Sequence, residues 1–460
     1  MSKPIFEKLW DLHTIKTIDE DNALMAIDRC YLHDLSGPQA MLMLLKGRHR
    51  PLNKQKVFAI PDHTISSKPG RTVGDSPISK KLYPLFYVGS KLFGIKLFGL
   101  KDSRQGIVHV VGPETGLSLP GMTITCGDSH TCTHGALGAL SWGVGSSELY
   151  HVLATQALKV TRPKTMQIEL SGLLKENVGP MDIILHMIAE KGVDFGIGYA
   201  VEYTGPVIWN MDMEERMTLC NLTVELGSEY GIISPDEKTL KYLENREYSP
   251  KGSEWEALKE HCTEIASAPD AVFDKSVAID VSSIERQVSW GITPGHTIAV
   301  SSEIPNISDD ADEKDKRSYE EAYGYMELVS GQKISGTPIQ RVFIGSCSNG
   351  RLSNIREVAK LVNGKKVAAD VEAWVVPGSQ EVKRKAEAEG LVKIITDAGF
   401  VWGEPCCSLC GGCNGEKVAG GHRCVSTTNR NFIGRQGQGA RTHLASPYTA
   451  VQAAINGQIR

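Results

Sequence analysis

Four cysteines lie close together in a glycine-rich segment near the end of the sequence. The segment GEPCCSLCGGCNG, residues 403–415, contains Cys406, Cys407, Cys410 and Cys413. Cysteines at such spacing serve a disulfide, a zinc site or an iron–sulfur cluster. The eleven cysteines of this long chain are too sparse for a secreted disulfide framework, so metal or redox chemistry is favoured.

Spacing alone leaves two metal centres open. Structural zinc usually takes two Cys-x2-Cys pairs, or one pair with two histidines, and here the pairs overlap at Cys410. His422 and Cys424 are close enough in sequence to complete a zinc site. An iron–sulfur cluster is also compatible, because glycines let backbone amides approach its sulfides.

A fifth cysteine lies far from this group but in a similar setting. Cys347 belongs to GSCSNGR, a turn of small residues directly after a predicted strand at 342–344. Such a turn is a poor place for a cysteine that only fills space in a core. Ligands bind beyond the carboxyl ends of strands in open α/β sheets, so Cys347 is a further candidate for the site.

Three short motifs place histidines near carboxylates: PDH at 61–63, GIVH at 106–109 and CGDSH at 126–130. Each is predicted to lie at or just after a strand end. A carboxylate that orients an imidazole is the arrangement that general acid–base catalysis needs. The candidate acid–base residues are Asp62, His63, His109, Asp128 and His130.

The segment NRNFIGRQGQGARTH, residues 429–443, combines arginines with glycines. Arg430 and Arg435 flank a predicted turn that includes Asn429 and Gly434. A planar guanidinium binds a carboxylate through two parallel hydrogen bonds. Glycines beside the arginines favour a tight turn directed at a ligand over a basic surface loop.

The elements that would position these residues follow an α/β pattern, in which apolar runs alternate with glycine and proline. Strands are predicted at 107–111, 122–126, 165–171, 200–205, 342–344 and 371–376. Helices are predicted at 180–192, from about 353, at 380–389 and within 235–275, with a loop at 127–135. The charged run 309–326 is predicted to be a solvated helix or a linker.

The bulk composition sets the class of protein. A chain of 460 residues is too long for one hydrophobic core, so about two to four domains are expected. The formal net charge of −4 gives no support for nucleic-acid binding. We expect a cytoplasmic protein, because neither a signal peptide nor a membrane span is visible in the sequence.

Together the motifs resemble the aconitase superfamily. The resemblance rests on six motifs in chain order: PDH, GIVH, CGDSHTCTHGALGAL, GSCSNGR, EPCCSLC and NRNFIGR. HDLSGPQA at 33–40 and SEYGIISPDEKT at 228–239 add to it. These motifs span nearly the whole chain, and within the superfamily they are most similar to the large subunits that isomerise isopropylmalate.

This resemblance implies an α/β fold with three α/β/α domains around a central iron–sulfur cluster, lacking the swivelling domain of single-chain aconitases. We place the domains at residues 1–163, 164–287 and 288–460. The first would carry the acid–base motifs, and the third would carry the cluster cysteines and the substrate arginines.

The resemblance also implies one [4Fe–4S] cluster per chain, held by three cysteines with the fourth iron open to substrate. The positions that match the family pattern are Cys347, Cys407 and Cys410. Cys406 stands where glycine is more usual, and Cys413 has no assigned partner. Either is an alternative ligand.

The family reaction removes water from a hydroxy-diacid and adds it back through an unsaturated diacid. By resemblance, His63 with Asp62, and Asp128 with its two histidines, would handle protons. The residues expected to bind substrate are Gln39, Ser129, Asn349, Asn429, Arg430 and Arg435. The expected activity is that of a hydro-lyase that converts 2-isopropylmalate to 3-isopropylmalate in leucine biosynthesis.

Two departures from the family pattern bear on the substrate. DHTISS at 62–67 stands where relatives commonly have DHNVPT, and LSGPQA stands where TSPQA is usual. Related acids, such as 2-methylmalate (citramalate), dimethylmalate or homocitrate-like acids, are therefore alternative substrates. A base and another substrate arginine are expected on a separate small subunit, which is the expected partner.

One alternative is not an enzyme. Superfamily members can lose the cluster and bind RNA, and a zinc-stabilised scaffold is a second form of this alternative. The near-neutral charge and the lack of interleaved aromatic and basic residues argue against RNA. The intact cysteines and acid–base residues favour the enzyme, with neither nucleic acid nor membrane as a partner.

Overall fold

The structure is a computed structural model that describes residues 2–308 and 313–460. The chain divides into two compact units, each built from separate segments. The first unit comprises the residues up to Ile65, Val73–Leu173 and Gly196–Val281, and the second comprises Ser66–Thr72, Leu174–Phe195 and Ser282–Arg460. The borders of three domains stay a prediction. Among the described residues, no helix is both long enough and apolar enough to cross a membrane.

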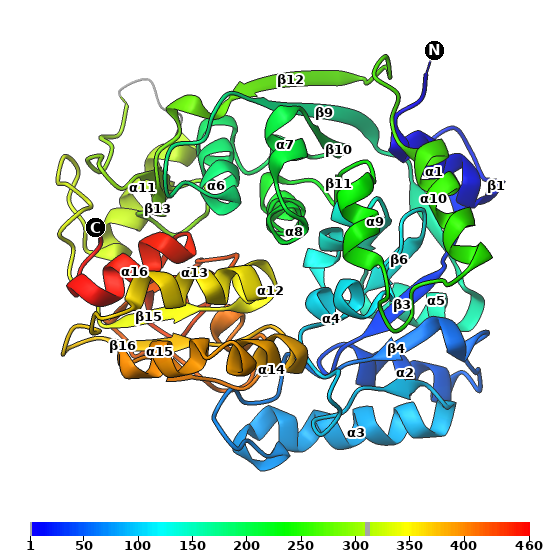
Figure 1. Ribbon diagram of the computed structural model, residues 1–460, viewed down its shortest axis with the longest axis horizontal. Coiled ribbons are helices and arrows are strands. Elements are labelled where there is room, and N and C mark those ends of the chain that lie inside the picture. Colours follow the sequence, from blue (N-terminus) through cyan, green and yellow to red (C-terminus); the bar gives the residue numbers. More distant parts are fainter. Residues whose placement is uncertain (1, 309–312) are drawn as a thin grey trace. The chain divides into compact units, whose positions relative to one another are not determined.

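A parallel sheet in the first unit carries the predicted acid–base motifs (Figure 1). Its strands are β3 (Arg29–Leu32), β4 (Val57–Ala59), β5 (Lys96–Leu97), β6 (Thr123–Cys126) and β7 (Leu140–Gly143). They pair in the order β5-β4-β3-β6-β7. Since all pairs are parallel, the carboxyl ends share one edge, where His33, Asp62 and Asp128 follow β3, β4 and β6.

The first unit also contains the helices α1 (Ile5–His13), α2 (Gly37–Lys46), α3 (Pro77–Phe93), α4 (Val108–Thr115) and α5 (Ser146–Thr155). α2 packs against α3 and α5 (Figure 1). α3 begins after Ser76, whose hydroxyl accepts the Ser79 amide hydrogen, and ends at Gly94 with φ 64°. A serine cap and a left-handed glycine are the usual signals that start and stop a helix.

A second parallel sheet completes the first unit. Its strands, β9 (Lys164–Ser171), β10 (Tyr199–Thr204), β11 (Tyr230–Ile232) and β12 (Lys275–Asp280), pair in the order β11-β10-β9-β12. The helices around it are α7 (Pro206–Asn210), α8 (Met213–Leu222), α9 (Glu237–Leu243) and α10 (Ser253–Ile265). An antiparallel sheet is formed by β1 (Thr14–Thr17), β2 (Asn22–Ala26) and β8 (Ala157–Thr161).

The second unit contains its own parallel sheet, which precedes the cysteine and arginine motifs. Its strands are β15 (Arg341–Ile344), β16 (Glu372–Val375), β17 (Val401–Trp402), β18 (Arg423–Ser426) and β19 (Arg441–Leu444). They pair in the order β17-β16-β15-β18-β19. β13 (Gln287–Ser289) and β14 (Thr297–Ala299) form an antiparallel pair.

The helices of the second unit are α6 (Pro180–Lys191), α11 (Glu313–Met326), α12 (Ser346–Asn349), α13 (Leu352–Val362), α14 (Gln380–Ala388), α15 (Leu391–Asp397) and α16 (Pro447–Asn456). Short 3₁₀ helices occur in both units: η1 (Lys54–Lys56), η2 (Val73–Asp75), η3 (Ser129–Leu137), η4 (Thr223–Leu226), η5 (Val281–Ser283) and η6 (Ser408–Cys410). The predicted helices at 180–192, from about 353 and at 380–389 are confirmed as α6, α13 and α14. Of the charged run 309–326, the part from 313 is helix α11, and 309–312 lie outside the described residues.

Two local predictions were wrong. The strand predicted at 107–111 is helix α4, and the loop predicted at 127–135 is largely the 3₁₀ helix η3. Because Val108, Val110 and Val111 are all buried, the apolar run carries no periodicity that separates helix from strand. The helix is decided by a distant group, since Asp62 Oδ2 accepts the N–H of Val108 at 2.9 Å.

A buried carboxyl in the second sheet of the first unit links stability to pH. Glu202 on β10 is 2% exposed and accepts hydrogen bonds from Ser234 Oγ at 2.9 Å and Ser267 Oγ at 2.7 Å. Burial raises the pKa of Glu202 to about 7, against the effect of these hydrogen bonds. The folded chain therefore keeps a proton that the unfolded chain releases above about pH 4.3. This contribution to stability is lost as the pH rises from about 4.3 to about 7.

Glu202→Gln is expected to stabilise the chain at pH 8 by about 3 kcal/mol and to change little at pH 5. The amide resembles the protonated carboxyl, so it removes only the cost of a buried charge. Calorimetric unfolding temperatures at the two pH values measure the effect, with exposed Glu254→Gln as the matched control. An equal change at both pH values would contradict the assignment.

Candidate active site

His63 stands between two carboxylates of the first unit. Its Nδ1 lies 2.5 Å from Asp62 Oδ1, and its Nε2 lies 3.1 Å from Asp128 Oδ2. An ionised carboxylate only accepts hydrogen bonds, so this arrangement calls for a proton on each ring nitrogen. The ring is thereby held in the form that can give a proton to a leaving group.

Asp128 is shared by three imidazoles. Besides His63, Nε2 of His109 lies 3.6 Å from Asp128 Oδ1, and Nδ1 of His130 lies 3.3 Å from the same oxygen. Burial alone would raise the pKa of Asp128, but contacts with the three histidines hold it well below its usual value. Burial also acts to raise the pKa of Asp62, but His63, His33 and the Val108 N–H together hold it below its usual value. Both carboxylates are therefore ionised at neutral pH.

Glu225 on η4 joins this group although no sequence motif indicated it. It accepts a hydrogen bond from Nε2 of His130 at 3.0 Å. Burial acts to lower the pKa of His130, but Asp128 and Glu225 outweigh burial and raise it. Glu225 lies 95 residues from His130 in sequence, in the segment NLTVELG, which has no neighbouring histidine to mark it.

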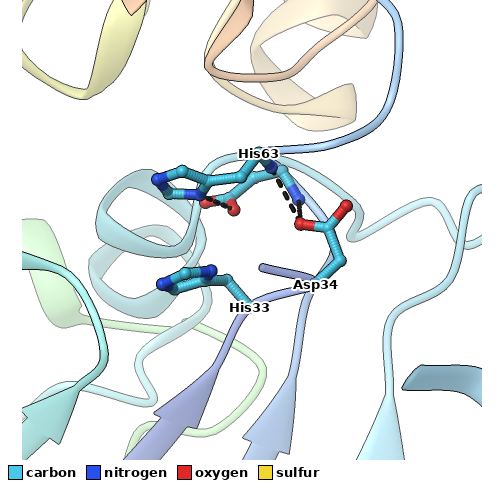
Figure 2. A group of neighbouring side chains, drawn as sticks. His33, Asp34 and His63 are labelled. Atoms are coloured by element: carbon cyan, nitrogen blue, oxygen red, sulfur yellow. Dashed lines mark hydrogen bonds and ion pairs between the residues drawn. The ribbon is translucent and has the colours of Figure 1, made fainter. Parts of the chain in front are cut away.

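His33, a second residue that the motifs did not assign, stacks on His63. Figure 2 shows the two rings lying one over the other. Their centroids are 4.2 Å apart, with an interplanar angle of 22°. His33 Nε2 lies 2.9 Å from the carbonyl oxygen of Gly127, and the N–H groups of Leu35 and Ser36 point at Nδ1. These contacts place the proton on Nε2. Burial and the neighbouring His63 lower the pKa of His33, so this ring is neutral.

Asp34 holds the backbone of the loop that carries His63 (Figure 2). Its Oδ1 accepts the N–H groups of Asp62 at 3.0 Å and His63 at 2.9 Å. Its Oδ2 accepts the N–H of Thr64 at 3.0 Å and the Thr64 hydroxyl. Three successive amide groups directed at one buried carboxylate fix the position from which the His63 side chain extends.

The donor atoms of His33, Asp34, Asp62 and His63 lie within 4.8 Å of one another, a spacing that suits a metal ion. However, the Asp34 carboxylate already accepts four hydrogen bonds, which uses its roughly four lone-pair positions. His33 Nδ1 is likewise engaged by backbone N–H groups. We therefore assign His33 and Asp34 to the positioning of His63.

Asp34→Asn is expected to destabilise the first unit and to lower activity. The amide keeps the size of the side chain but turns a hydrogen-bond donor toward the N–H groups of the loop. A buried donor without an acceptor costs about 1–3 kcal/mol, so the unfolding temperature should fall by about 2–5 °C. Thermal unfolding measures this, with exposed Asp270→Asn as the control. An unfolding temperature equal to that of the control would contradict the role of Asp34 in holding the loop.

The other two predicted substrate residues of the first unit, Gln39 and Ser129, follow strands β3 and β6 along the chain. Gln39 is exposed on α2, and Ser129 is half-buried at the start of η3, directly after Asp128. Their contact with substrate stays a prediction.

The second unit brings the predicted cluster cysteines together. Cys347 lies in α12 after β15, and Cys407 and Cys410 lie at η6, which contacts α12. Asn429 connects the two segments, because its Oδ1 is 3.5 Å from Cys410 Sγ and its Nδ2 is 3.9 Å from Cys347 Sγ. The thiols of Cys347 and Cys410, from separate parts of the sequence, therefore share one amide, and Cys407 directly precedes η6 in the same segment as Cys410.

The predicted substrate residues of the second unit differ in their surroundings. Nε of Arg435 donates to the carbonyl oxygen of Cys410 at 2.7 Å, so this arginine lies against the cysteine loop. Arg430 is half-buried directly after Asn429. Asn349 is 2% exposed, and its Nδ2 donates to the carbonyl oxygen of Thr427 at 3.0 Å. This contact gives Asn349 a structural role beside the cysteines, and substrate binding by it stays a prediction.

Comparison with known proteins identifies the family of this chain. The model of the aconitase family (aconitate hydratase) matches residues 7–457. The chain belongs to the aconitase family. The chain is similar to the 3-isopropylmalate dehydratase large subunit 1 of Bradyrhizobium diazoefficiens, with 49% identity over 458 residues, or 99% of this chain and 96% of that protein. Aconitase X from Thermococcus kodakaraensis, in its holo form, matches with a TM-score of 0.46 and 11% identity over 93% of this chain and 88% of that chain.

Membership of the aconitase family confirms the predicted α/β aconitase-like fold and implies an iron–sulfur cluster. The cysteines of the second unit fit such a group. All eleven cysteines of the chain are free thiols, and Cys347, Cys407 and Cys410 are buried. Two non-glycine residues beside them, Ser346 (φ 73°) and Ser408 (φ 48°), adopt the left-handed region. Such backbone costs on the order of 1–3 kcal/mol and is concentrated at functional sites.

The remaining cysteines of this aconitase-family chain are less suited to hold a metal. Cys424 is fully buried on β18 within a hydrophobic cluster, and burial raises the pKa of its thiol to about 12. It is therefore a packed core residue, and the zinc site with His422 loses a ligand. Cys406 is fully buried, and the Cys413 thiol, which is half-buried, donates to the carbonyl oxygen of Gly411 at 3.6 Å.

A carboxylate anchors the cysteine loop of the second unit. Glu416 accepts hydrogen bonds from Ser66 Oγ at 2.8 Å, from the N–H and hydroxyl of Ser67, both at 2.6 Å, and from Ser408 Oγ at 2.7 Å. Ser66 and Ser67 belong to the stretch 62–67 that departs from the aconitase-family pattern. Their hydroxyls serve the loop that carries Cys407 and Cys410.

Proposed function

We propose that this chain is the large subunit of an isopropylmalate dehydratase, a hydro-lyase that isomerises 2-isopropylmalate to 3-isopropylmalate in leucine biosynthesis. The observation that carries the proposal is the 49% identity, over 99% of the chain, to a protein of that name. The same name supports a separate small subunit as the partner. Membership of the aconitase family supports the reaction class, removal and addition of water.

The proposed cofactor is one [4Fe–4S] cluster per chain, held by Cys347, Cys407 and Cys410. When bound, a cluster with one open iron supplies a Lewis acid for the hydroxyl and a carboxylate of the substrate. The burial of the three thiols, the contact that Cys347 and Cys410 share with Asn429, and the strained backbone at Ser346 and Ser408 support this assignment.

The chain's own contribution to dehydration is a proton for the departing hydroxyl group. Hydroxide is a poor leaving group, and protonation lets it depart as water. His63 is the proposed donor, supported by its contacts with Asp62 and Asp128, which favour a proton on both ring nitrogens. The proton on the neighbouring carbon is proposed to pass to a base on the small subunit. Addition of water to the other carbon of the double bond reverses these transfers.

The substrate is a diacid, and its carboxylates need fixed donors. Arg430 and Arg435 are proposed to bind a carboxylate and to offset the charge that develops on it. The bond from Arg435 to the Cys410 carbonyl supports a place for this arginine beside the cluster. Gln39, Ser129, Asn349 and Asn429 are the other proposed contacts.

A related 2-alkylmalate is the second candidate substrate, because the stretch 62–67 departs from the family pattern. The structure gives three of the departing side chains another explanation. Thr64 binds Asp34, and Ser66 and Ser67 bind Glu416. These contacts explain the different residues at 62–67 by the structure of the loops, without a change in the substrate pocket. We therefore rank 2-isopropylmalate above 2-methylmalate (citramalate) and dimethylmalate.

The test is an anaerobic assay of the chain co-purified with its small subunit, in which formation of the unsaturated diacid is followed. We expect kcat/KM for 2-isopropylmalate to exceed that for 2-methylmalate and dimethylmalate by about 10-fold or more, since each missing methylene costs about 1–3 kcal/mol. A higher kcat/KM for 2-methylmalate or dimethylmalate would make that acid the assigned substrate. A colourless, zinc-containing preparation that turns over none of these acids would overturn the proposal that the chain is an enzyme and would favour a zinc-stabilised scaffold.

A further inference from the structure

A line of hydrogen-bonding side chains runs from His109, which faces Asp128, into the interior of the first unit. His109 Nε2 faces Asp128 Oδ1 at 3.6 Å, and His109 Nδ1 lies 3.1 Å from Nε2 of His134. Nδ1 of His134 lies 2.9 Å from Ser118 Oγ, which lies 2.7 Å from the Tyr31 hydroxyl oxygen. None of the roles assigned above to the reaction falls on His134, which lies in the motif at 126–140, or on Ser118 or Tyr31.

These groups are shielded from water. His134, Ser118 and Tyr31 are fully buried, and His109 is 1% exposed. The Tyr31 ring stacks on His134 with centroids 5.3 Å apart, and the His134 ring meets His109 edge to face at 5.2 Å. Burial raises the pKa of Tyr31 to about 12, so its hydroxyl keeps its proton. A buried, closely spaced line of this kind has a fixed order of donors and acceptors.

The ends of the line set its direction. Asp128, being ionised, can only accept, so Nε2 of His109 carries the hydrogen that faces it. His109 Nδ1 then accepts from His134 Nε2–H, and His134 Nδ1 accepts from the Ser118 hydroxyl. Ser118 Oγ in turn accepts from Tyr31, whose hydroxyl has Ser118 as its one hydrogen-bond partner within the described parts of the chain. If the order were reversed, Ser118 would donate to Tyr31, and the Tyr31 hydroxyl hydrogen would have no acceptor among the residues that the structure describes. His109 Nε2 would then face the ionised Asp128 without a hydrogen.

Gly112 on α4 keeps the space that the line needs. A Cβ at this position would lie 2.8 Å from His134 Cε1, 2.8 Å from Ser118 Oγ and 2.9 Å from the Tyr31 hydroxyl. All three distances are shorter than real Cβ contacts. The backbone of α4, which carries His109, thus packs directly against three members of the line.

We propose that His134, Ser118 and Tyr31 are positioning residues that fix His109 as the Nε2–H tautomer facing Asp128. Asp128 thereby receives a defined donor from His109, while its other oxygen is left to His63. The proposal rests on the proposed function for its kinetic consequence, but the tautomer itself is a property of the chain alone.

The tautomer is read by ¹⁵N NMR of the imidazole nitrogens in the full-length chain, labelled at histidine and prepared without the cluster. A His109→Gln variant assigns the signals of His109. In the wild type we expect a protonated Nε2 and an unprotonated Nδ1. The His134→Leu variant removes the donor to His109 Nδ1, so we expect a mixture of His109 tautomers. The His134→Gln variant keeps a side-chain amide that can donate to His109 Nδ1, so we expect the His109 signals to return toward those of the wild type. An unchanged His109 signal in folded His134→Leu would overturn the proposal.

The kinetic test uses the complex with the small subunit and 2-isopropylmalate. His134→Leu is expected to lower kcat by about 10²-fold, the low end of an acid–base contribution, with KM nearly unchanged. Effects should fall along the line, to about 10-fold for Ser118→Ala and about threefold for Tyr31→Phe, because each leaves more donors in place. His13→Gln, a buried histidine paired with Asp28, is the control and should leave kcat unchanged.

Two further outcomes separate the possible failures. If His134→Leu does not fold, Ser118→Ala and Tyr31→Phe carry the test, and equal effects of these two on the His109 signals would contradict a directional line. If the wild-type complex turns over none of the 2-alkylmalates but the tautomer shifts as expected, the proposed function fails and the positioning role stands.

Discussion

His63→Asn is expected to lower kcat for 2-isopropylmalate by about 10³-fold, within the range for loss of a general acid. The imidazole spans Asp62 and Asp128 with a proton on each nitrogen, and a shorter amide cannot reach both carboxylates or release a proton. The measurement is the anaerobic dehydration rate of the complex, together with the visible absorption of the cluster, which should be unchanged.

The control for this variant is His151→Asn, which replaces an exposed histidine of the same unit. It should keep wild-type kcat. Activity of His63→Asn within about threefold of the control would remove His63 from the proton transfer, since that leaves less than 1 kcal/mol for its role. Loss of the cluster absorption would instead point to a structural effect.

Serine at Cys347, Cys407 or Cys410 is expected to abolish the brown colour and to lower activity by at least about 10²-fold, because the Lewis acid is lost with the cluster. Serine keeps the size of the side chain but is a poor ligand for iron. Iron and sulfide contents of anaerobic preparations measure the loss directly, without reference to turnover.

Two comparisons make this test specific. Cys262→Ser replaces a buried cysteine on α10 of the first unit and should keep full iron and sulfide. Cys406→Ser and Cys413→Ser test the alternative ligands and should also keep the cluster. A chain that retains the cluster as Cys347→Ser and loses it as Cys413→Ser would refute the ligand assignment.

The parallel sheets were predictable because their strands appear as short runs rich in apolar and β-branched residues between turn signals. The predicted strand 165–171 corresponds to β9 (Lys164–Ser171), and 371–376 corresponds to β16 (Glu372–Val375). The pairing of histidines with carboxylates near predicted strand ends indicated an acid–base role for Asp62, His63 and Asp128. In the structure these side chains are in contact.

The supporting residues were not predictable in the same way. Asp34 acts through backbone amides 28 to 30 residues away, and Glu225 reaches His130 from the 3₁₀ helix η4, 95 residues along the chain. His134 lies inside the motif at 126–140, but its sequence neighbours do not indicate that it contacts His109 and Ser118. Helix α4 was mistaken for a strand for a similar reason, since Asp62 and the close approach at Gly112 decide its conformation.

The hydrogen bonds of Glu416 to Ser66, Ser67 and Ser408 have a consequence for folding during translation. Ser67 precedes its partner by 349 residues, which at about 5–20 residues per second means roughly 20–70 s of translation. The loop that Glu416 anchors therefore closes only after residue 416 has left the ribosome. Cys347 emerges before Cys407 and Cys410, the other two proposed cluster ligands. For the proposed cluster, we therefore expect iron and sulfide to be delivered late in translation or after it, and the three thiols to need protection from oxidation until then.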